Sequence, residues 1–401
     1  MELYLRRLTD IMLFAAITLF PAYLWESGSM QVSHYFFLFF AGLVFYRRKA
    51  LQFDTFDIVL LFFVLYCWTR EVLAVLHEAS YATLLPAAHF TYSLIIFKAA
   101  RLYADDAQKQ KILSAGLITS LLIVLGAVLF EGTSLVYDGK MPRSTGTFNN
   151  PNQLGYYSIL TVSLGLFLYI NRIVSWWLFL LVAAGSFFIS IVSLSKAAII
   201  SMSVVVMFVV VELFRRFLAL EPKQKVLLAV SISAIAIPSS FAVSANMQHR
   251  FSDLMVYKRL SMMYTDENDS TLSSRGYDIL PQSSINEMLF GISTEGVKMR
   301  NGNEIHSTFV SALTNYGFAG GSLFVLFFCL LAWNAVSHYG IWNTVCLLLP
   351  ATLYGITHNG SRSTLFWVLL SLVSISQTDE KMNEYDTDRS RGNEITKIRL
   401  S

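Results

Sequence analysis

Residues 176–214 read WWLFLLVAAGSFFISIVSLSKAAIISMSVVVMFVVVELF and are apolar almost throughout. The short polar motif Ser193–Lys196 divides this stretch into two runs. Each run approaches the roughly 20 residues that a helix needs to cross the hydrocarbon core of a bilayer. A backbone within lipid must satisfy its own hydrogen bonds, so such runs must be helical. The stretch therefore predicts two membrane-spanning helices joined by a tight turn.

The same pattern extends along the chain and predicts about twelve spans. They are expected at residues 11–25, 35–46, 58–76, 84–103, 112–130, 153–170, 176–194, 197–214, 226–245, 308–335, 341–356 and 364–376. The first span is not expected to be a cleavable signal peptide, because no small-residue cleavage site follows it. We therefore expect an all-α integral membrane protein.

Four regions follow from this prediction. Residues 1–245 hold the first nine spans, and residues 246–307 form a large polar loop in which apolar patches predict short helices. Residues 308–376 hold the last three spans. Residues 377–401 are polar with mixed charges and no apolar face, so we expect a disordered tail.

The composition excludes a mostly soluble protein. Hydrophobic residues make up 55% of the chain and charged residues only 14%, against about 25% charged residues in soluble domains. The three cysteines lie inside apolar runs without a CxxC pair, which predicts neither a zinc site nor a disulfide framework. The net charge of +3 gives no reason to expect a nucleic acid partner. No P-loop is present, which disfavours a transporter with its own ATPase, and no dinucleotide fingerprint, HExxH or GxSxG is present either.

The loops predict the orientation, because Lys and Arg accumulate in short cytoplasmic loops. Basic residues precede the first span and follow the second, fourth, sixth and eighth, whereas connections such as 26–33 and 77–83 lack Lys and Arg. The basic positions are Arg6, Arg7, Arg47, Arg48, Lys49, Lys98, Arg101, Lys109, Lys111, Arg172, Arg215, Arg216, Lys223 and Lys225. This alternation predicts that both termini are cytoplasmic and that residues 131–152 and 246–307 lie outside.

Polar motifs at the outer ends of the spans are the candidate functional residues. Arg143 precedes Asn150-Pro151-Asn152, which opens a predicted helix whose free N–H groups, with Arg143 nearby, can bind an anion. The alternative is an ordinary helix cap, with Asn150 as the capping residue. Lys196, in the tight turn, can contact a ligand or extend its ammonium group to the interface.

The remaining candidates lie farther along the chain. Arg275 lies in the long loop, where a single Arg is usually solvated. His306 is a candidate base at neutral pH, or a surface residue that hydrogen-bonds. Gly317 and Gly320 allow close approach between helices. The last outer connection adds His358 and Arg362.

The predicted topology brings several cations and a neutral-pH base to one side of the membrane. They are Arg143, Lys196, Arg275, His306, His358 and Arg362. Cations that converge beside a base suit a phosphate leaving group and a hydroxyl nucleophile. No acidic cluster with metal-ligand spacing competes with them, so we expect neither a metal nor another cofactor.

These motifs resemble the O-antigen ligase and O-antigen polymerase superfamily of bacterial envelope glycan assembly. The resemblance covers about residues 143–367 and rests on four segments in the family's order. They are Gly146-Thr-Phe-Asn-Asn-Pro-Asn152, Ser193-Leu-Ser-Lys-Ala-Ala198, Ser274-Arg-Gly276, and His306 followed by Asn315-Tyr-Gly-Phe-Ala-Gly320. The resemblance implies a multi-pass protein of the bacterial inner membrane with a periplasmic active site.

The resemblance also implies a metal-independent, inverting glycosyltransferase whose donor is a glycan on undecaprenyl pyrophosphate. By this likeness Arg275 binds the pyrophosphate and His306 orients or deprotonates the acceptor hydroxyl. Lys196, Arg143 and Arg362 are expected to add charge at the pyrophosphate, the last two by position and chemistry. Asn150, Asn152, His358, Gly317 and Gly320 are expected to be structural or to lie on the acceptor side.

The identity of the acceptor distinguishes the functions that remain open. Another lipid-linked repeat unit makes the protein a polysaccharide polymerase, and the lipid A core makes it a ligase. Lys196 stands where the family usually has Arg, and Ser307 stands where ligases commonly have Asn, so we favour the polymerase. Partners would be the donor, the acceptor, membrane lipid and, as a candidate, a chain-length regulator. A transporter or flippase is the alternative from another class, but its spans usually carry charges near the midplane.

Overall fold

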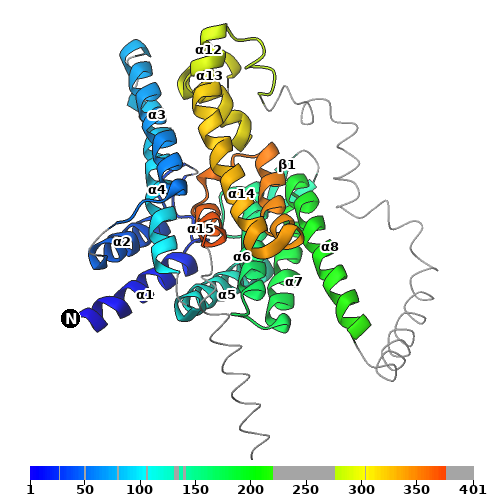
Figure 1. The fold of residues 1–401 in the computed structure, drawn as a ribbon. Coiled ribbons are helices and arrows are strands. Elements are labelled where there is room, and N and C mark those ends of the chain that lie inside the picture. Colours follow the sequence, from blue (N-terminus) through cyan, green and yellow to red (C-terminus); the bar gives the residue numbers. More distant parts are fainter. Residues whose placement is uncertain are drawn as a thin grey trace, which may run out of the picture.

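The computed structural model describes residues 1–26, 28–48, 51–78, 81–104, 107–130, 135–138, 141–219, 276–302 and 304–375, and the fold is shown in Figure 1. Three predictions lie outside these residues: the ninth span at 226–245, the site residue Arg275 and the tail at 377–401. The first half of the large loop, residues 246–275, also lies outside them.

The described residues are mostly helical. The helices of the first half are α1 (Glu2–Thr18), α2 (Val32–Arg47), α3 (Thr55–Glu78), α4 (Leu85–Tyr103), α5 (Ala107–Phe130), α6 (Pro151–Ile170), α7 (Trp176–Ser193) and α8 (Lys196–Ala219). The later helices are α12 (Ile285–Phe290), α13 (Thr294–Asn301), α14 (Thr308–Thr357) and α15 (Thr364–Val373). Short 3-10 turns are η1 (Tyr81–Leu84) and η3 (Gly360–Arg362), and an antiparallel pair joins β1 (Leu135–Asp138) to β2 (Met141–Ser144).

Every predicted span within the described residues overlaps a helix, but the count of twelve is not confirmed. Among the residues that the structure describes, six helices are long and apolar enough to cross a membrane: α3, α5, α6, α7, α8 and α14. Helix α2 has 16 residues and α15 has 10, which correspond to roughly 24 Å and 15 Å against a core of about 30 Å. The structure therefore supports a helical protein with about six spanning helices.

Helix α14 contains two of the predicted spans, because its backbone is interrupted. Gly317 has φ 63° and ψ −171°, and Gly340 has φ 74° and ψ 163°, so neither residue is helical. The break at Gly340 lies between the spans predicted at 308–335 and 341–356. The first predicted span, at 11–25, was placed too late, since α1 ends at Thr18. Pro21 follows closely, and proline cannot continue a helix.

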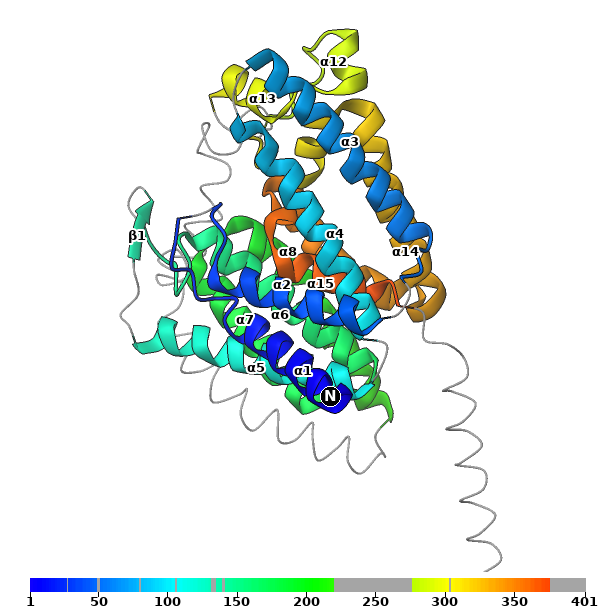
Figure 2. The same ribbon diagram turned by 90° about the vertical axis from the view of Figure 1, so that its left-hand side faces the viewer.

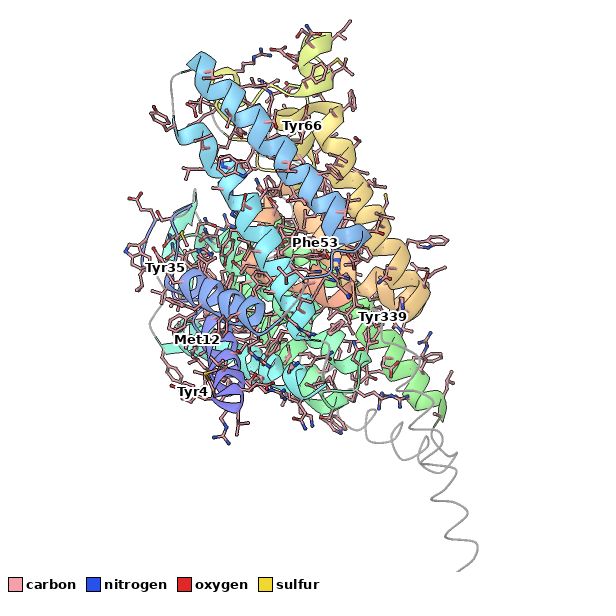
Figure 3. The ribbon with its side chains drawn as sticks, turned by 60° about the vertical axis from the view of Figure 1, so that its left-hand side comes forward. Tyr4, Met12, Tyr35, Phe53, Tyr66 and Tyr339 are labelled. Carbon is pink, nitrogen blue, oxygen red and sulfur yellow. The ribbon has the colours of Figure 1, made fainter. Side chains whose placement is uncertain are left out.

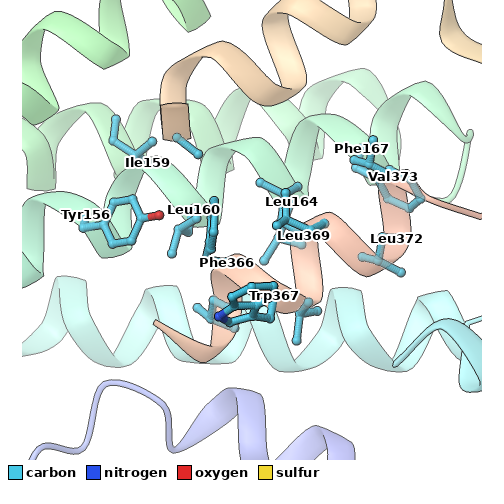
Figure 4. Close-up of a cluster of buried hydrophobic side chains, with 14 of the residues drawn as sticks. Tyr156, Ile159, Leu160, Leu164, Phe167, Phe366, Trp367, Leu369, Leu372 and Val373 are labelled. Atoms are coloured by element: carbon cyan, nitrogen blue, oxygen red, sulfur yellow. The ribbon is translucent and has the colours of Figure 1, made fainter. Parts of the chain in front are cut away.

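The helices form two groups, which meet where α14 packs against α6 and α8 and where α15 packs against α4 and α6. Helices α3, α4 and α14 run side by side, and α1 packs against α2 and α5 (Figure 2). Helix α6 is buried along nearly its whole length between α7, α8, α14 and α15. Figure 4 shows the core that results, where Leu160 and Leu164 of α6 face Phe366 and Leu369 of α15.

Large apolar side chains also cover the outside of the molecule. Phe62 and Leu65 on α3, and Val210 and Phe214 on α8, are exposed. Figure 3 places Phe53 just before one end of α3 and Tyr66 farther along it, toward α12. Apolar surface on long helices is what lipid-facing positions require, because the bilayer core offers no polar partner.

Candidate functional site

Arg143 joins three elements at one corner of the molecule. It lies in β2 and is only 6% exposed. Its Nε donates a hydrogen bond to the Ser193 carbonyl at the end of α7 (3.1 Å), and its Nη2 donates to Asn152 Oδ1 in the first turn of α6 (2.8 Å). Lys196, which is half-buried, opens α8 three residues after Ser193. The first two predicted motifs therefore meet through Arg143.

Asn150 is the N-cap of α6. Its Oδ1 accepts a hydrogen bond from the Gln153 amide (2.9 Å), and its backbone is extended (φ −150°). This is the capping geometry that satisfies one free amide of the first turn. Asn150 therefore caps α6, which is the structural alternative that the sequence allowed. Asn152 does not cap the helix, and its side chain accepts a hydrogen bond from Arg143.

Tyr354 connects Asn152 to His358. Its hydroxyl donates to the Asn152 carbonyl (2.7 Å), and its ring stacks on the His358 imidazole with centroids 4.7 Å apart. The ring of Tyr156 also stacks on the Tyr354 ring, with centroids 4.2 Å apart. His358 Nδ1 lies 2.9 Å from Thr357 Oγ1. Sequence reasoning missed Tyr156 and Tyr354, since tyrosine in an apolar helix is an ordinary core residue.

Hydroxyl side chains that follow His306 bond the backbone around His358. Ser307, the N-cap of α14, donates from Oγ to the Gly355 carbonyl (3.2 Å). Thr308 Oγ1 donates to the His358 carbonyl (3.1 Å) and accepts from the Gly360 amide (2.7 Å). The start of α14 is thereby fixed against the loop that carries His358, and the His306 side chain is exposed beside it.

Arg362 forms an ion pair with Glu304. This pair is the second link between the two loops, because Glu304 stands two residues before His306. Both side chains are partly exposed, at 48% and 38%, so water screens the pair. Sequence reasoning missed Glu304, although an acidic residue beside a proposed anion site was a signal that could have found it.

Ser361 anchors the other side of this loop. Its carbonyl accepts from Trp367 Nε1 (2.6 Å), and His89 Nε2 of α4 lies 3.0 Å from the same oxygen. Next to it, a side chain at Gly360 would collide with the Tyr156 hydroxyl. That hydroxyl is buried and has no hydrogen-bond partner among the described residues. The loop that carries His358 and Arg362 is therefore held rigidly against α4 and α6.

The helical backbone of α14 is broken at Gly317, and the segment at residues 291–293 packs against this break. The amide of Ile292 donates to the Thr314 carbonyl (3.0 Å), and that of Ser293 donates to the Asn315 carbonyl (3.2 Å). A side chain at Gly317 would meet the backbone of Gly291. The expectation of a close approach between helices at Gly317 is met by the end of α12, because the backbone of Leu289 lies there beside that of Gly291.

Helix α3 holds the same segment from its other side. Arg70 donates to the Gly291 carbonyl from Nε (3.2 Å) and Nη2 (3.0 Å). Glu71 is fully buried and accepts from Thr294 Oγ1 (2.9 Å). At Gly320 a side chain would lie 2.7 Å from the Tyr66 ring, so α14 approaches α3 closely there. Arg70 and Glu71 give no sequence signal beyond their position near a span end.

These contacts connect Arg143, Asn152 and His358, while Ser307, Thr308 and the Glu304–Arg362 ion pair join the segments that carry His306 and Arg362. Arg275 lies outside the described residues, and Gly276 after it packs against Ile305, the residue before His306. Among the described residues, no group of three or more His, Cys, Asp and Glu side chains is placed to hold a metal ion. Comparison of the chain with known protein families and with curated proteins finds no match.

Proposed function

We propose that this protein is a membrane glycosyltransferase that polymerises polysaccharide repeat units at the periplasmic face of the bacterial inner membrane. The donor is a glycan on undecaprenyl pyrophosphate, and the acceptor hydroxyl belongs to another lipid-linked repeat unit. The observation that supports this proposal best is the connection from Arg143 to His358: hydrogen bonds join Arg143 to Asn152 and Asn152 to Tyr354, and the Tyr354 ring stacks on His358. It unites motifs about 200 residues apart, each of which contributes polar groups suited to a phosphate or a hydroxyl.

The reaction is a single displacement. The acceptor oxygen attacks the anomeric carbon, the bond from that carbon to the pyrophosphate oxygen breaks, and its electron pair leaves with the pyrophosphate. The hydroxyl proton passes to the imidazole of His306, which is exposed beside the start of α14. Attack opposite the leaving group inverts the anomeric configuration.

The cations stabilise the departing pyrophosphate. Arg275 and Lys196 bind it, and Arg143 adds positive charge from a buried position where few water molecules screen it. Arg362 contributes once the pyrophosphate competes with Glu304 for its guanidinium group. His358 and Tyr354 position the start of α14 and with it His306.

Ser307 supports the polymerase over the ligase. Its hydroxyl is buried, caps α14 and bonds the Gly355 carbonyl, so it serves the fold and does not reach an acceptor. A ligase acting on the lipid A core commonly has Asn at this position by the resemblance above. The acceptor side of the site therefore differs here from the ligase pattern.

A deletion strain complemented with variants tests the proposal through its glycans. His306→Ala should reduce long polymer by about 100-fold or more, with single repeat units still attached to their acceptor. His338→Ala, an exposed histidine elsewhere on α14, is the matched control and should restore normal polymer. Unattached lipid-linked polymer in the deletion strain would indicate a ligase. Unchanged glycans in every strain would reject a glycosyltransferase.

A further inference from the structure

A cavity lined by basic side chains lies where the ends of α1, α2, α4 and α5 meet. Its residues all precede the motifs described above in the sequence. It is lined by Glu2 and Arg6 of α1, by Val44, Arg47 and Arg48 at the end of α2, by Leu102 and Tyr103 at the end of α4, and by Lys109 of α5. Its volume is about 300 Å³, enough for a small ligand. Four cations against one carboxylate give the lining a strong positive charge.

Protein contacts hold two of these cations at the wall. Arg48 donates from Nη2 to the Leu102 carbonyl (2.6 Å), and Arg47 donates from Nη1 to Thr9 Oγ1 (3.5 Å). Arg47 Nε is buried and has no hydrogen-bond partner among the described residues. Because a buried donor without an acceptor is costly, this group favours a bound acceptor in or beside the cavity. Arg6 is exposed and pairs with Glu2 (2.6 Å).

An apolar groove lies between two of the same helices, α1 and α5. Ile11 and Phe14 of α1 face Ile112 and Ala115 of α5, with Asp10 at the edge, around about 260 Å³. These positions follow Arg6 and Lys109 by about one to two helical turns on each helix. Helices α1 and α5 lie side by side in Figure 2. A charged cavity and an apolar groove along the same two helices match the polarity of a phospholipid, with its charged headgroup and apolar acyl chain.

We propose that the cavity binds the phosphate headgroup of an anionic phospholipid whose acyl chain lies in the groove between α1 and α5. Both features are needed, since a free anion gains nothing from the groove and a neutral lipid gains little from the cations. The cavity lies at the ends of four helices, and the end of a helix that crosses the membrane, as α5 is long and apolar enough to do, lies at the depth of lipid headgroups. In the predicted topology this end is cytoplasmic, where basic pockets between helices meet anionic lipid.

Native mass spectrometry of the full-length protein in detergent tests the proposal. Phosphatidylglycerol should bind at a concentration at least about tenfold lower than phosphatidylcholine with the same acyl chains. The double variant Arg6→Gln/Lys109→Gln should lose this preference. Arg7→Gln/Lys111→Gln removes the same charge from exposed positions of the same helices outside the cavity and should keep it.

Two further measurements distinguish binding of a lipid from binding of another anion. Ala115→Phe fills the groove without a change in charge and should weaken phosphatidylglycerol binding about tenfold, whereas millimolar inorganic phosphate should not displace the lipid. Equal binding of both lipids, an equal loss in both double variants, or full displacement by inorganic phosphate would each overturn the proposal. Size-exclusion profiles that match the wild type establish that each variant is folded.

Discussion

The hydroxyl of Tyr354 donates a hydrogen bond to the carbonyl of Asn152, although the two residues are 202 positions apart in the sequence. Asn152 also accepts from Arg143, and Tyr354 stacks on His358. This one contact therefore couples the Arg143 corner to the loop that carries the second histidine. Its loss should separate the two halves of the proposed site while leaving every charged group in place.

Tyr354→Phe should lower polymer synthesis more than it lowers stability. The ring and its stacking remain, and the lost hydrogen bond costs about 1 kcal/mol of unfolding free energy. Glycan gels compare polymer yield, and thermal unfolding in detergent measures stability. Tyr46→Phe, at an exposed position on α2, is the control and should change neither. Normal polymer from Tyr354→Phe would mean that the contact is structural only.

Gly317→Ala should destabilise the protein by more than about 2 kcal/mol, because φ 63° with ψ −171° is a conformation that only glycine adopts readily. Its methyl group would also collide with the backbone at Gly291. Gly126→Ala in α5 is the matched control, since nothing lies within 4 Å of a side chain there. It should stabilise the helix by about 0.5–1 kcal/mol. Equal thermal unfolding of the two variants would contradict the break at Gly317.

Arg362→Gln and Glu304→Gln separate an ion pair from a ligand contact. The pair is partly exposed, so either change should alter stability by no more than about 1 kcal/mol. If Arg362 binds the leaving pyrophosphate, only Arg362→Gln should reduce polymer synthesis, by about tenfold or more. Glu304→Gln should keep or raise it, because it releases the guanidinium group. An equal reduction in both variants would assign Arg362 to loop structure alone.

The contribution of Glu287 to stability should disappear in acid. The hydrogen bond from Arg300 is the largest cause that lowers the pKa of this carboxyl, from 4.5 to about 2, and the Ser284 amide adds to it. A carboxyl with a lowered folded pKa stabilises the protein above its unfolded pKa, and this stabilisation is lost as the pH falls toward the folded pKa. The difference in melting temperature between wild type and Glu287→Gln should therefore be constant above about pH 5 and shrink between pH 4.5 and 2. In an Arg300→Gln background the difference should be smaller and its loss should be complete at a higher pH, because the folded pKa then lies closer to the unfolded one. A difference that is independent of pH would refute the pairing.

The positions of the helices were predictable because a bilayer imposes a local requirement. A run of about 20 apolar residues must be helical in lipid, and α6, α7 and α8 begin within two residues of their predicted starts. The helix cap at Asn150 was one of the two roles predicted for its motif, because capping depends on residues three positions apart. The first span was misplaced because its charged start, including Arg6 and Arg7, is helical although it is not apolar.

Tertiary structure alone decided how these helices and motifs meet. The bonds from Tyr354 to Asn152 and from Arg70 to Gly291 join residues more than 200 positions apart, and no local pattern specifies such partners. The sequence by itself determined that the chain is a helical, lipid-adapted protein, since the apolar run length and helix capping act within a few turns. Which charges are paired, where α14 breaks and where the cavity of α1, α2, α4 and α5 opens depend on packing between distant segments, and only the folded structure determines them.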